Sequence, residues 1–151
     1  MDFDLNEDQV AFAEAAKQFS DQMLAPQAAE WDETSHFPKE VIRQAGELGF
    51  LSIYTAPEHG GLGLSRLDAA IIFEQLAMGC TATTAFMTIH NMATWMITSF
   101  AKRHVADQFS ADLVSGEKLA SYCLTEPNAG SDAASLTTNA VRDGDEFVLN
   151  G

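Results

Sequence analysis

The sequence has few cysteines and few basic residues, and both shortages exclude classes of protein. Its two cysteines, Cys80 and Cys123, cannot build a disulfide framework and lack the spacing of a metal site, which predicts a reducing compartment and no bound metal. Only 8 Lys and Arg stand against 22 Asp and Glu. The resulting net charge of −14 argues against nucleic acid or an anionic membrane as a partner.

Long apolar stretches are also missing. No run approaches the roughly 20 apolar residues that a helix needs to cross a bilayer, so no membrane span is expected. The first residues are acidic and form neither a secretory signal nor an Arg-rich mitochondrial presequence. These absences predict a cytoplasmic protein, and 151 residues are enough for one domain with a real core.

Residues 1–117 show the apolar periodicity of a helical bundle. Asn6, with Gln9 three residues later, is a helix start signal. Pro26 is expected to kink or break this first helix, because proline removes a backbone donor and clashes with the preceding turn. Pro38 suits the first residue of a second helix, which Gly49 would terminate.

Three further helices are predicted in the same region. Ser65 and Asp68 open one, Thr81 opens the next, and a shorter helix ends at Gly116. The apolar residues that recur on one face of these five helices are Phe12, Phe19, Met23, Val41, Ile42, Ala45, Leu48, Ala69, Ile72, Phe73, Leu76, Phe86, Ile89, Ala93, Ile97, Phe100, Val105, Phe109 and Leu113.

Residues 118–151 have the pattern of strands. Residues 119–125, 137–142 and 146–149 are strand-like, and Asp143-Gly144 is a hairpin turn signal between the last two. Two or three strands cannot close a sheet or bury both of its faces. We therefore expect a mainly α fold, with an incomplete β region at the end and the chain forming the front part of a longer protein.

The most informative stretch runs from residue 122 to 132 with the sequence YCLTEPNAGSD. A short apolar run ends at Thr125, and a loop of small residues containing Gly130 and Ser131 follows. Glycine removes the side-chain barrier, while hydroxyls add donors beside the free N–H groups of a turn. This pattern is typical of backbone close to a flat or anionic ligand. An ordinary strand-to-turn junction, with an Asx turn at Asp132, explains it equally well.

Other candidates have plain structural interpretations beside functional ones. The glycines at 60–63 fail as a nucleotide loop, because Arg66 occupies the place of the third glycine, and they suit a flexible connector. His90 is either a buried, hydrogen-bonded histidine or a ligand contact. The Met and aromatic residues around it form either core or the wall of an acyl pocket; they are Phe86, Met87, Met92, Trp95 and Met96.

The sequence resembles the acyl-CoA dehydrogenase family along its whole length. The matching pieces, in order, are LNEDQ at 5–9, AP at 25–26, EWD at 30–32, LGF at 48–50, GGLGLS at 60–65, YCLTEPNAGSD at 122–132 and GDEFVLNG at 144–151. The pieces GLSRLD at 63–68, IHNM at 89–92, WMI at 95–97 and the stretch 120–136 are most similar to the short branched-chain branch of that family.

The resemblance implies an N-terminal helical domain, a middle β-barrel-like domain and a C-terminal four-helix domain. This chain matches the first domain over residues 1–117 and the first strands of the second over 118–151. The resemblance also implies a homotetramer that uses FAD to insert a double bond between Cα and Cβ of an acyl-CoA. An electron-transfer flavoprotein is the implied electron acceptor, isobutyryl-CoA the favoured substrate, and valine breakdown the implied pathway.

Carried over by position, the resemblance also implies roles for single residues. The FAD contacts would be Tyr122, Cys123, Leu124, Thr125, Gly130 and Ser131, and the acyl-CoA contacts would be Ser131, His90 and Met87. Glu126 is not assigned as the base, because in the family the base is a glutamate of the C-terminal domain. The chain is thus expected to contain no catalytic residue and to be inactive alone.

Two alternatives remain beside this interpretation. One keeps the fold and changes the oxidant, as in an acyl-CoA oxidase or a flavin monooxygenase. The other is a non-catalytic helical module kept for protein association, which predicts a folded species without flavin and with an exposed apolar surface.

Overall fold

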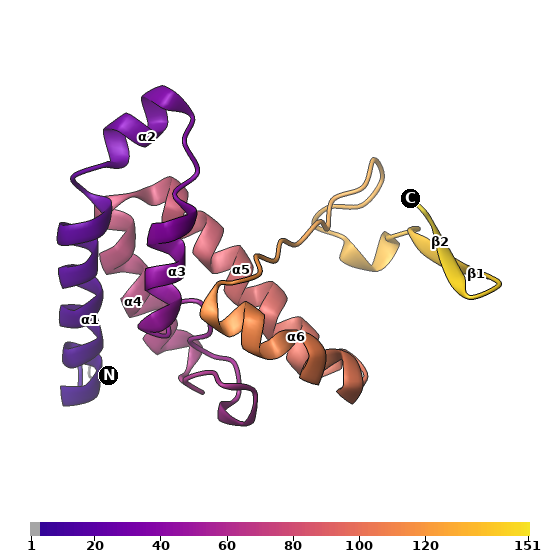
Figure 1. Cartoon of the computed structure of the whole chain (residues 1–151), viewed down its shortest axis with the longest axis horizontal. Coiled ribbons are helices and arrows are strands. Elements are labelled where there is room, and N and C mark those ends of the chain that lie inside the picture. Colours follow the sequence, from indigo (N-terminus) through magenta and orange to yellow (C-terminus); the bar gives the residue numbers. More distant parts are fainter. Residues whose placement is uncertain (1–3) are drawn as a thin grey trace. The chain divides into compact units, whose positions relative to one another are not determined.

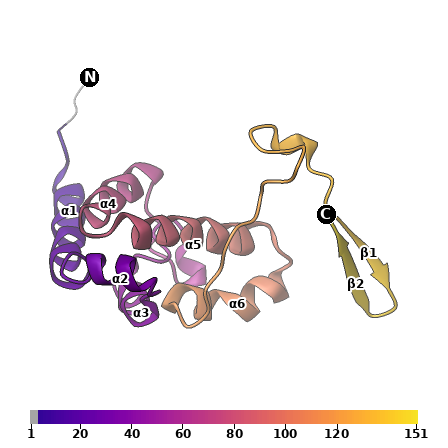
Figure 2. The same cartoon turned by 90° about the horizontal axis from the view of Figure 1, so that it is seen from above.

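The computed structural model describes residues 4–151 and divides the chain into two compact units. The first unit extends to Ser121 and the second covers Tyr122–Gly151. The six α-helices of the described residues are α1 (Glu7–Phe19), α2 (Ala28–Thr34), α3 (Lys39–Glu47), α4 (Arg66–Gly79), α5 (Thr81–Phe100) and α6 (Arg103–Ser115). Helix α1 lies against α4, and α5 lies against both α4 and α6 (Figures 1 and 2). The mainly helical fold class is confirmed.

Both predicted start signals are complete capping boxes. The Asn6 side chain accepts a hydrogen bond from the Gln9 N–H at 2.9 Å, and the Gln9 side chain accepts one from the Asn6 N–H at 3.2 Å. Ser65 and Asp68 repeat this arrangement at the start of α4. Each box satisfies two backbone donors that the first turn of a helix leaves free. Gln9 also donates to Asp68 at 3.0 Å, which ties the starts of α1 and α4 together.

The prolines act near the predicted positions. Helix α1 continues as a π-helical turn over Ser20–Leu24 and stops before Pro26, as expected. Pro38 is the N-cap of α3 and not its first helical residue. The prediction that Leu48 faces inward is wrong, since this side chain is 54% exposed. The helix ends at Glu47, so the helical spacing that placed Leu48 on the inner face no longer applies.

The core of the helical unit lies where α1, α3, α4 and α5 meet. Its buried members are Ala16, Phe19, Leu24, Trp31, Val41, Ile42, Ala45, Phe50, Leu51, Ile53, Ala69, Ile72, Leu76 and Met87. Phe19 and Phe50 meet edge to face with their ring centroids 5.7 Å apart. Aromatic pairs prefer this geometry, and it joins α1 to the loop that follows α3.

The inner face of α5 differs from the predicted apolar stripe. Phe100 is 72% exposed and Ile89 is 36% exposed, so both predictions are wrong. The buried residues of α5 are Thr83, Thr84, Met87, His90, Asn91, Ala93, Thr94 and Thr98. Two of the polar residues, His90 and Asn91, are fully buried because they hydrogen-bond backbone groups of other segments. The spacing of apolar residues along a sequence cannot show which polar side chains will be buried with such partners.

The glycine-rich connector after α3 is held by backbone hydrogen bonds. The N–H groups of Leu62 and Gly63 donate to the carbonyls of Ser52 and Thr55 at 3.0 and 2.9 Å. A Cβ atom on Gly61 would lie 2.1 Å from the Thr55 carbonyl oxygen. Only glycine allows the two backbone segments to approach this closely.

We therefore expect Gly61→Ala to lower the free energy of unfolding by about 1–3 kcal/mol, the usual cost of inserting a methyl group into a filled space. Urea unfolding followed by circular dichroism measures this change. Gly130→Ala is the matched control, since nothing lies within 4 Å of a Cβ built there. Equal stability of the two variants would contradict the close approach.

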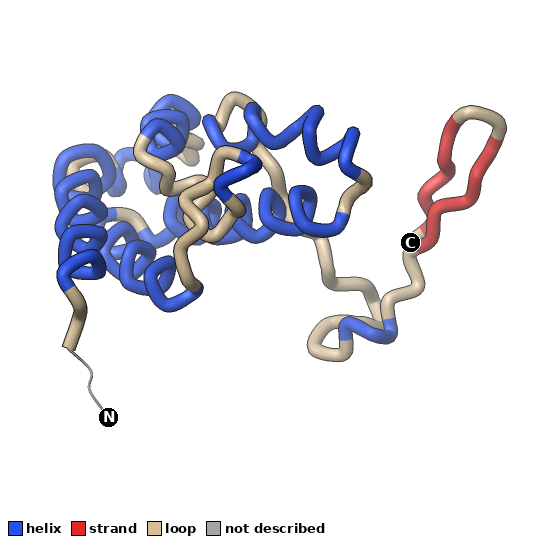
Figure 3. Tube along the Cα trace, turned by 90° about the horizontal axis from the view of Figure 1, so that it is seen from below, coloured by secondary structure: helices blue, strands red, loops and turns tan. Residues whose placement is uncertain are grey.

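The second unit contains a β-hairpin of β1 (Asn139–Asp143) and β2 (Glu146–Asn150), drawn in red in Figure 3. The strands are antiparallel, with Val141 opposite Val148, and Gly144 in the turn has a φ of 61°. This confirms the predicted hairpin. The predicted strand at 119–125 is wrong: the segment is extended but pairs with no strand among the described residues. A strand needs a neighbour to satisfy its backbone groups.

None of the helices in residues 4–151 combines the length and the apolar character that crossing a membrane requires.

Candidate functional site

The segment that carries the YCLTEPNAGSD motif begins as extended backbone and then turns. Along this segment burial alternates: Tyr122 and Leu124 are half-buried, whereas Cys123 and Thr125 are exposed. Glu126 and Ala129 then exchange two backbone hydrogen bonds, of 2.8 and 3.2 Å, across a tight turn. This two-residue turn sets the direction of the chain before it enters the small-residue loop.

Glu126 fixes that turn to the start of the hairpin. One of its carboxylate oxygens accepts hydrogen bonds from the N–H and the hydroxyl of Thr137, at 2.8 and 2.9 Å. The other oxygen accepts from the N–H of Thr138 at 2.9 Å and from the Thr138 hydroxyl. These bonds, that of the Thr138 hydroxyl above all, lower the pKa of Glu126 to about 2. A carboxylate so stabilised in its charged form is a poor proton acceptor.

A cavity of about 530 Å³ lies in this second unit beside the segment. It is lined by Cys123, Leu124, Thr125, Glu126, Pro127, Leu136, Thr138, Leu149 and Gly151. The lining mixes aliphatic side chains with hydroxyls and backbone. Such a surface suits a flat ligand with a polar edge better than a compact ion. Three of the predicted cofactor residues, Cys123, Leu124 and Thr125, line the cavity; Tyr122, Gly130 and Ser131 do not.

Gly130 lies beside open space, and two exposed hydroxyls lie near it in the sequence. A Cβ built on Gly130 meets no atom within 4 Å, so the fold of the described residues does not itself require glycine there. The hydroxyls of Thr125 and Ser131 are exposed and donate no hydrogen bond within residues 4–151. Open space beside glycine, together with free hydroxyl donors, is the chemistry that a flavin dinucleotide would meet at its polar edge and its phosphates. The residue types present are compatible with FAD, and their contacts to it stay a prediction.

His90 lies in the helical unit and is fully buried. Its Nδ1 accepts the N–H of Ala120 at 3.0 Å, so the proton is on Nε2, which donates to the carbonyl of Leu113 at 2.9 Å. Burial lowers the pKa of His90 from its usual value. Met87, one turn earlier on α5, is also fully buried. The geometry gives both residues internal partners, and substrate contact by them stays a prediction.

Sequence reasoning missed the two threonines that bind Glu126. Thr137 and Thr138 lie 11 and 12 residues after it, and their sequence pattern indicates only a strand. The available signal was weak: two consecutive hydroxyl residues before a hairpin. Glu126 can bond both threonines only if the intervening loop brings them back to it. No short-range sequence pattern predicts that conformation of the loop.

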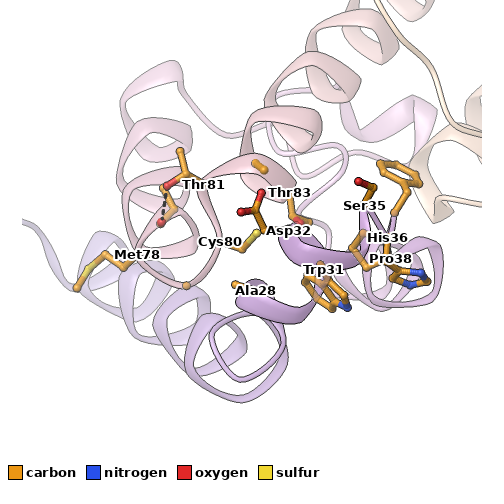
Figure 4. A pocket seen from close by; sticks show the side chains of 14 residues that line it. Ala28, Trp31, Asp32, Ser35, His36, Pro38, Met78, Cys80, Thr81 and Thr83 are labelled. Carbon is orange, nitrogen blue, oxygen red and sulfur yellow. Dashed lines mark hydrogen bonds between the residues drawn. The ribbon is translucent and has the colours of Figure 1, made fainter.

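A second cavity, of about 440 Å³, lies in the helical unit between α2 and the junction of α4 and α5 (Figure 4). Trp31, Asp32, His36 and Cys80 are among its lining residues. The Cys80 thiol donates to the Thr83 hydroxyl at 3.2 Å. None of the predicted site residues lines this cavity. Within residues 4–151 there is also no group of three or more His, Cys, Asp or Glu side chains able to hold a metal ion.

Comparison with known proteins shows which family this architecture belongs to. The model of the acyl-CoA dehydrogenase N-terminal domain matches residues 6–117. The chain therefore belongs to the acyl-CoA dehydrogenase family. It is 50% identical, over 97% of its length, to the mitochondrial isobutyryl-CoA dehydrogenases of Bos taurus and of Dictyostelium discoideum. The chain spans about a third of these relatives, 35% of each.

Solved structures agree with this membership. The glutaryl-coenzyme A dehydrogenase in complex with glutaryl-CoA is 31% identical, with a TM-score of 0.88, and the match covers 100% of this chain and 39% of that one. PigA with FAD and proline is 27% identical, with a TM-score of 0.89, and the match covers 100% of this chain and 40% of that one.

The comparisons also correct one prediction. The cytoplasmic location expected from the acidic first residues is wrong, since the isobutyryl-CoA dehydrogenases named above are mitochondrial. The first residues of this chain were an insufficient basis for a location.

Proposed function

We propose that this chain is the N-terminal portion of an FAD-dependent acyl-CoA dehydrogenase that acts on a short branched-chain acyl-CoA, with isobutyryl-CoA as the favoured substrate. The observation that carries the proposal is the 50% identity to two isobutyryl-CoA dehydrogenases over 97% of the chain. The proposed reaction removes hydrogen from Cα and Cβ, as a step in valine breakdown. In this proposal residues 1–117 are the helical domain, and residues 118–151 open the β domain.

The segment at 122–131 is the proposed flavin contact. FAD, when bound, supplies the acceptor for the hydride that leaves Cβ. The Thr125 hydroxyl and the backbone beside it would hold the polar edge of the flavin ring. The N–H groups near Gly130 and the Ser131 hydroxyl would meet a phosphate or the acyl-CoA. The support for these roles is the open face of Gly130 and the two exposed hydroxyls.

Proton abstraction from Cα is proposed to use a base outside this chain. Glu126 lies in the right motif, but both of its oxygens already accept two hydrogen bonds, and they are not free to take a proton. The chain alone is accordingly proposed to lack dehydrogenase activity. A homotetramer and an electron-transfer flavoprotein as electron acceptor complete the proposal for the intact protein.

The first test is a visible absorption spectrum of the intact protein that contains this chain. We expect a flavin band, and we expect isobutyryl-CoA to bleach it under anaerobic conditions faster than glutaryl-CoA does. Gly130→Val is expected to weaken the band, because the new side chain fills the open space beside the segment. Far-UV circular dichroism checks that this variant remains folded. A folded wild type that stays colourless after FAD is added would contradict the proposal.

A further inference from the structure

We propose that Glu126 is a positioning residue, whose carboxylate holds the cofactor-facing segment in the shape that receives the flavin. This inference rests on the proposed function and adds a role for a residue that does not itself touch the reacting atoms. The base of the reaction is proposed to lie elsewhere, which leaves a carboxylate in the middle of the motif without a chemical task.

The hydrogen bonds of Glu126 form a two-pronged clamp. Each carboxylate oxygen accepts one backbone N–H and one hydroxyl from the same threonine: one oxygen bonds Thr137 and the other bonds Thr138. A carboxylate has about four lone-pair sites, so all of its acceptor capacity is used. Bonds to a charged acceptor are stronger than neutral ones, and two adjacent threonines fix the orientation of the carboxylate plane.

The clamp joins both sides of the cavity in the second unit. Glu126 follows Thr125 directly and starts the turn that leads to Gly130. Thr138 lines the same cavity from the residue before β1. Release of the carboxylate would therefore free the two walls from each other.

Among the side-chain hydrogen bonds of residues 122–151, those of Glu126 join the motif to the residues before β1. Residues 131–151 are all exposed, and Ala129 is the one buried residue among residues 122–151. A two-stranded hairpin is marginal on its own in water. Within these residues the Glu126 carboxylate therefore holds the turn of the motif to the residues before β1. A segment ordered before its ligand arrives binds that ligand more tightly, because less ordering is required on binding.

The experiment compares four variants of the intact protein: Glu126→Gln, Glu126→Ala, Thr138→Val and Thr138→Ser. Glutamine has the same shape, but an NH₂ group replaces one carboxylate oxygen. This NH₂ group would face two donors of one threonine and cannot accept their hydrogen bonds. We expect Glu126→Gln and Glu126→Ala to weaken FAD binding about tenfold or more. Thr138→Val loses one hydroxyl donor and should have a smaller effect. Thr138→Ser keeps both donors and should bind FAD as the wild type does.

FAD affinity is measured by titration of the apoprotein, and the shape of the visible flavin band is recorded for each holoprotein. A residue that only stabilises the fold would change the amount of flavin bound and leave the band of the bound fraction unchanged. We expect a shifted or less structured band in Glu126→Gln that Thr138→Ser does not show. Far-UV circular dichroism identifies any variant that fails to fold, and the two threonine variants then decide the question.

The two proposals fail in different ways. A wild type without any flavin band overturns the proposed function. A wild type with a flavin band, together with folded Glu126→Gln that matches it in affinity and in band shape, overturns the positioning role alone. Thr138→Val and Thr138→Ser with equal affinity and equal spectra would also count against the clamp.

Discussion

Replacement of Asn91 by alanine is expected to lower the free energy of unfolding by about 3–5 kcal/mol. The Asn91 side chain is fully buried on α5 and makes three hydrogen bonds. Its amide nitrogen donates to the carbonyls of Phe50 and Met87 at 2.8 and 2.9 Å, and its oxygen accepts the N–H of Ile53 at 2.8 Å. Alanine would leave buried backbone groups of Phe50 and Ile53 without a partner, and each such group costs about 1–3 kcal/mol.

Urea unfolding followed by circular dichroism measures the Asn91 effect. Ser99→Ala is the control, because Ser99 is an exposed residue of the same helix, and a change there should stay within about 0.5 kcal/mol. Asn91→Asp keeps the acceptor, loses the donor and buries a charge, so it should be about as damaging as alanine. If Asn91→Ala proved as mild as Ser99→Ala, the loop after α3 would not depend on α5 for its hydrogen bonds.

His90→Leu is expected to lower the free energy of unfolding by about 2–4 kcal/mol. Leucine is similar in size but removes the acceptor for the Ala120 N–H and the donor to the Leu113 carbonyl. The Leu113 carbonyl lies in the last turn of α6 and also accepts the N–H of Gly116 at 3.2 Å, so His90 supplies its second hydrogen bond. The Ala120 bond fixes the backbone two residues before Tyr122. Urea unfolding and amide hydrogen exchange at Ala120 measure the two losses separately.

The same residue predicts a pH dependence. Because burial holds the pKa of His90 in the folded state below its usual 6.5, the neutral form is the one that stabilises the fold. That contribution is complete above about pH 6.5 and is lost as the pH falls through the lower, folded-state pKa, at no more than about 1.4 kcal/mol per pH unit.

The wild type should therefore lose stability between pH 7.5 and 5.5, and His90→Leu should lack this part of the loss. Unfolding midpoints of both proteins at the two pH values give the comparison. Glu126 does not interfere in this range, since its pKa of about 2 lies far below it. Parallel losses in the two proteins would show that His90 is not the group responsible.

Short-range signals in the sequence predicted much of this protein. The capping boxes at Asn6 and Ser65 join residues three apart, and the turn at Asp143-Gly144 joins two adjacent strands. Such signals act within one turn of chain, so they hold wherever the segment lies in the fold. The series of matching pieces along the chain, with the motif at 122–132 among them, likewise indicated the family, because residue types and their order are visible without any structure.

The tertiary structure alone decided the polar interior and the clamp on the candidate site. The hydrogen bonds of Asn91 to Ile53 and Phe50 span 38 and 41 residues, and those of His90 to Leu113 and Ala120 span 23 and 30. Glu126 finds its partners 11 and 12 residues away. A polar side chain becomes stable in a buried position only when a distant backbone group arrives to pair with it. The sequence by itself therefore determined most of the helices, the hairpin and the family, and folding decided which polar residues became structural.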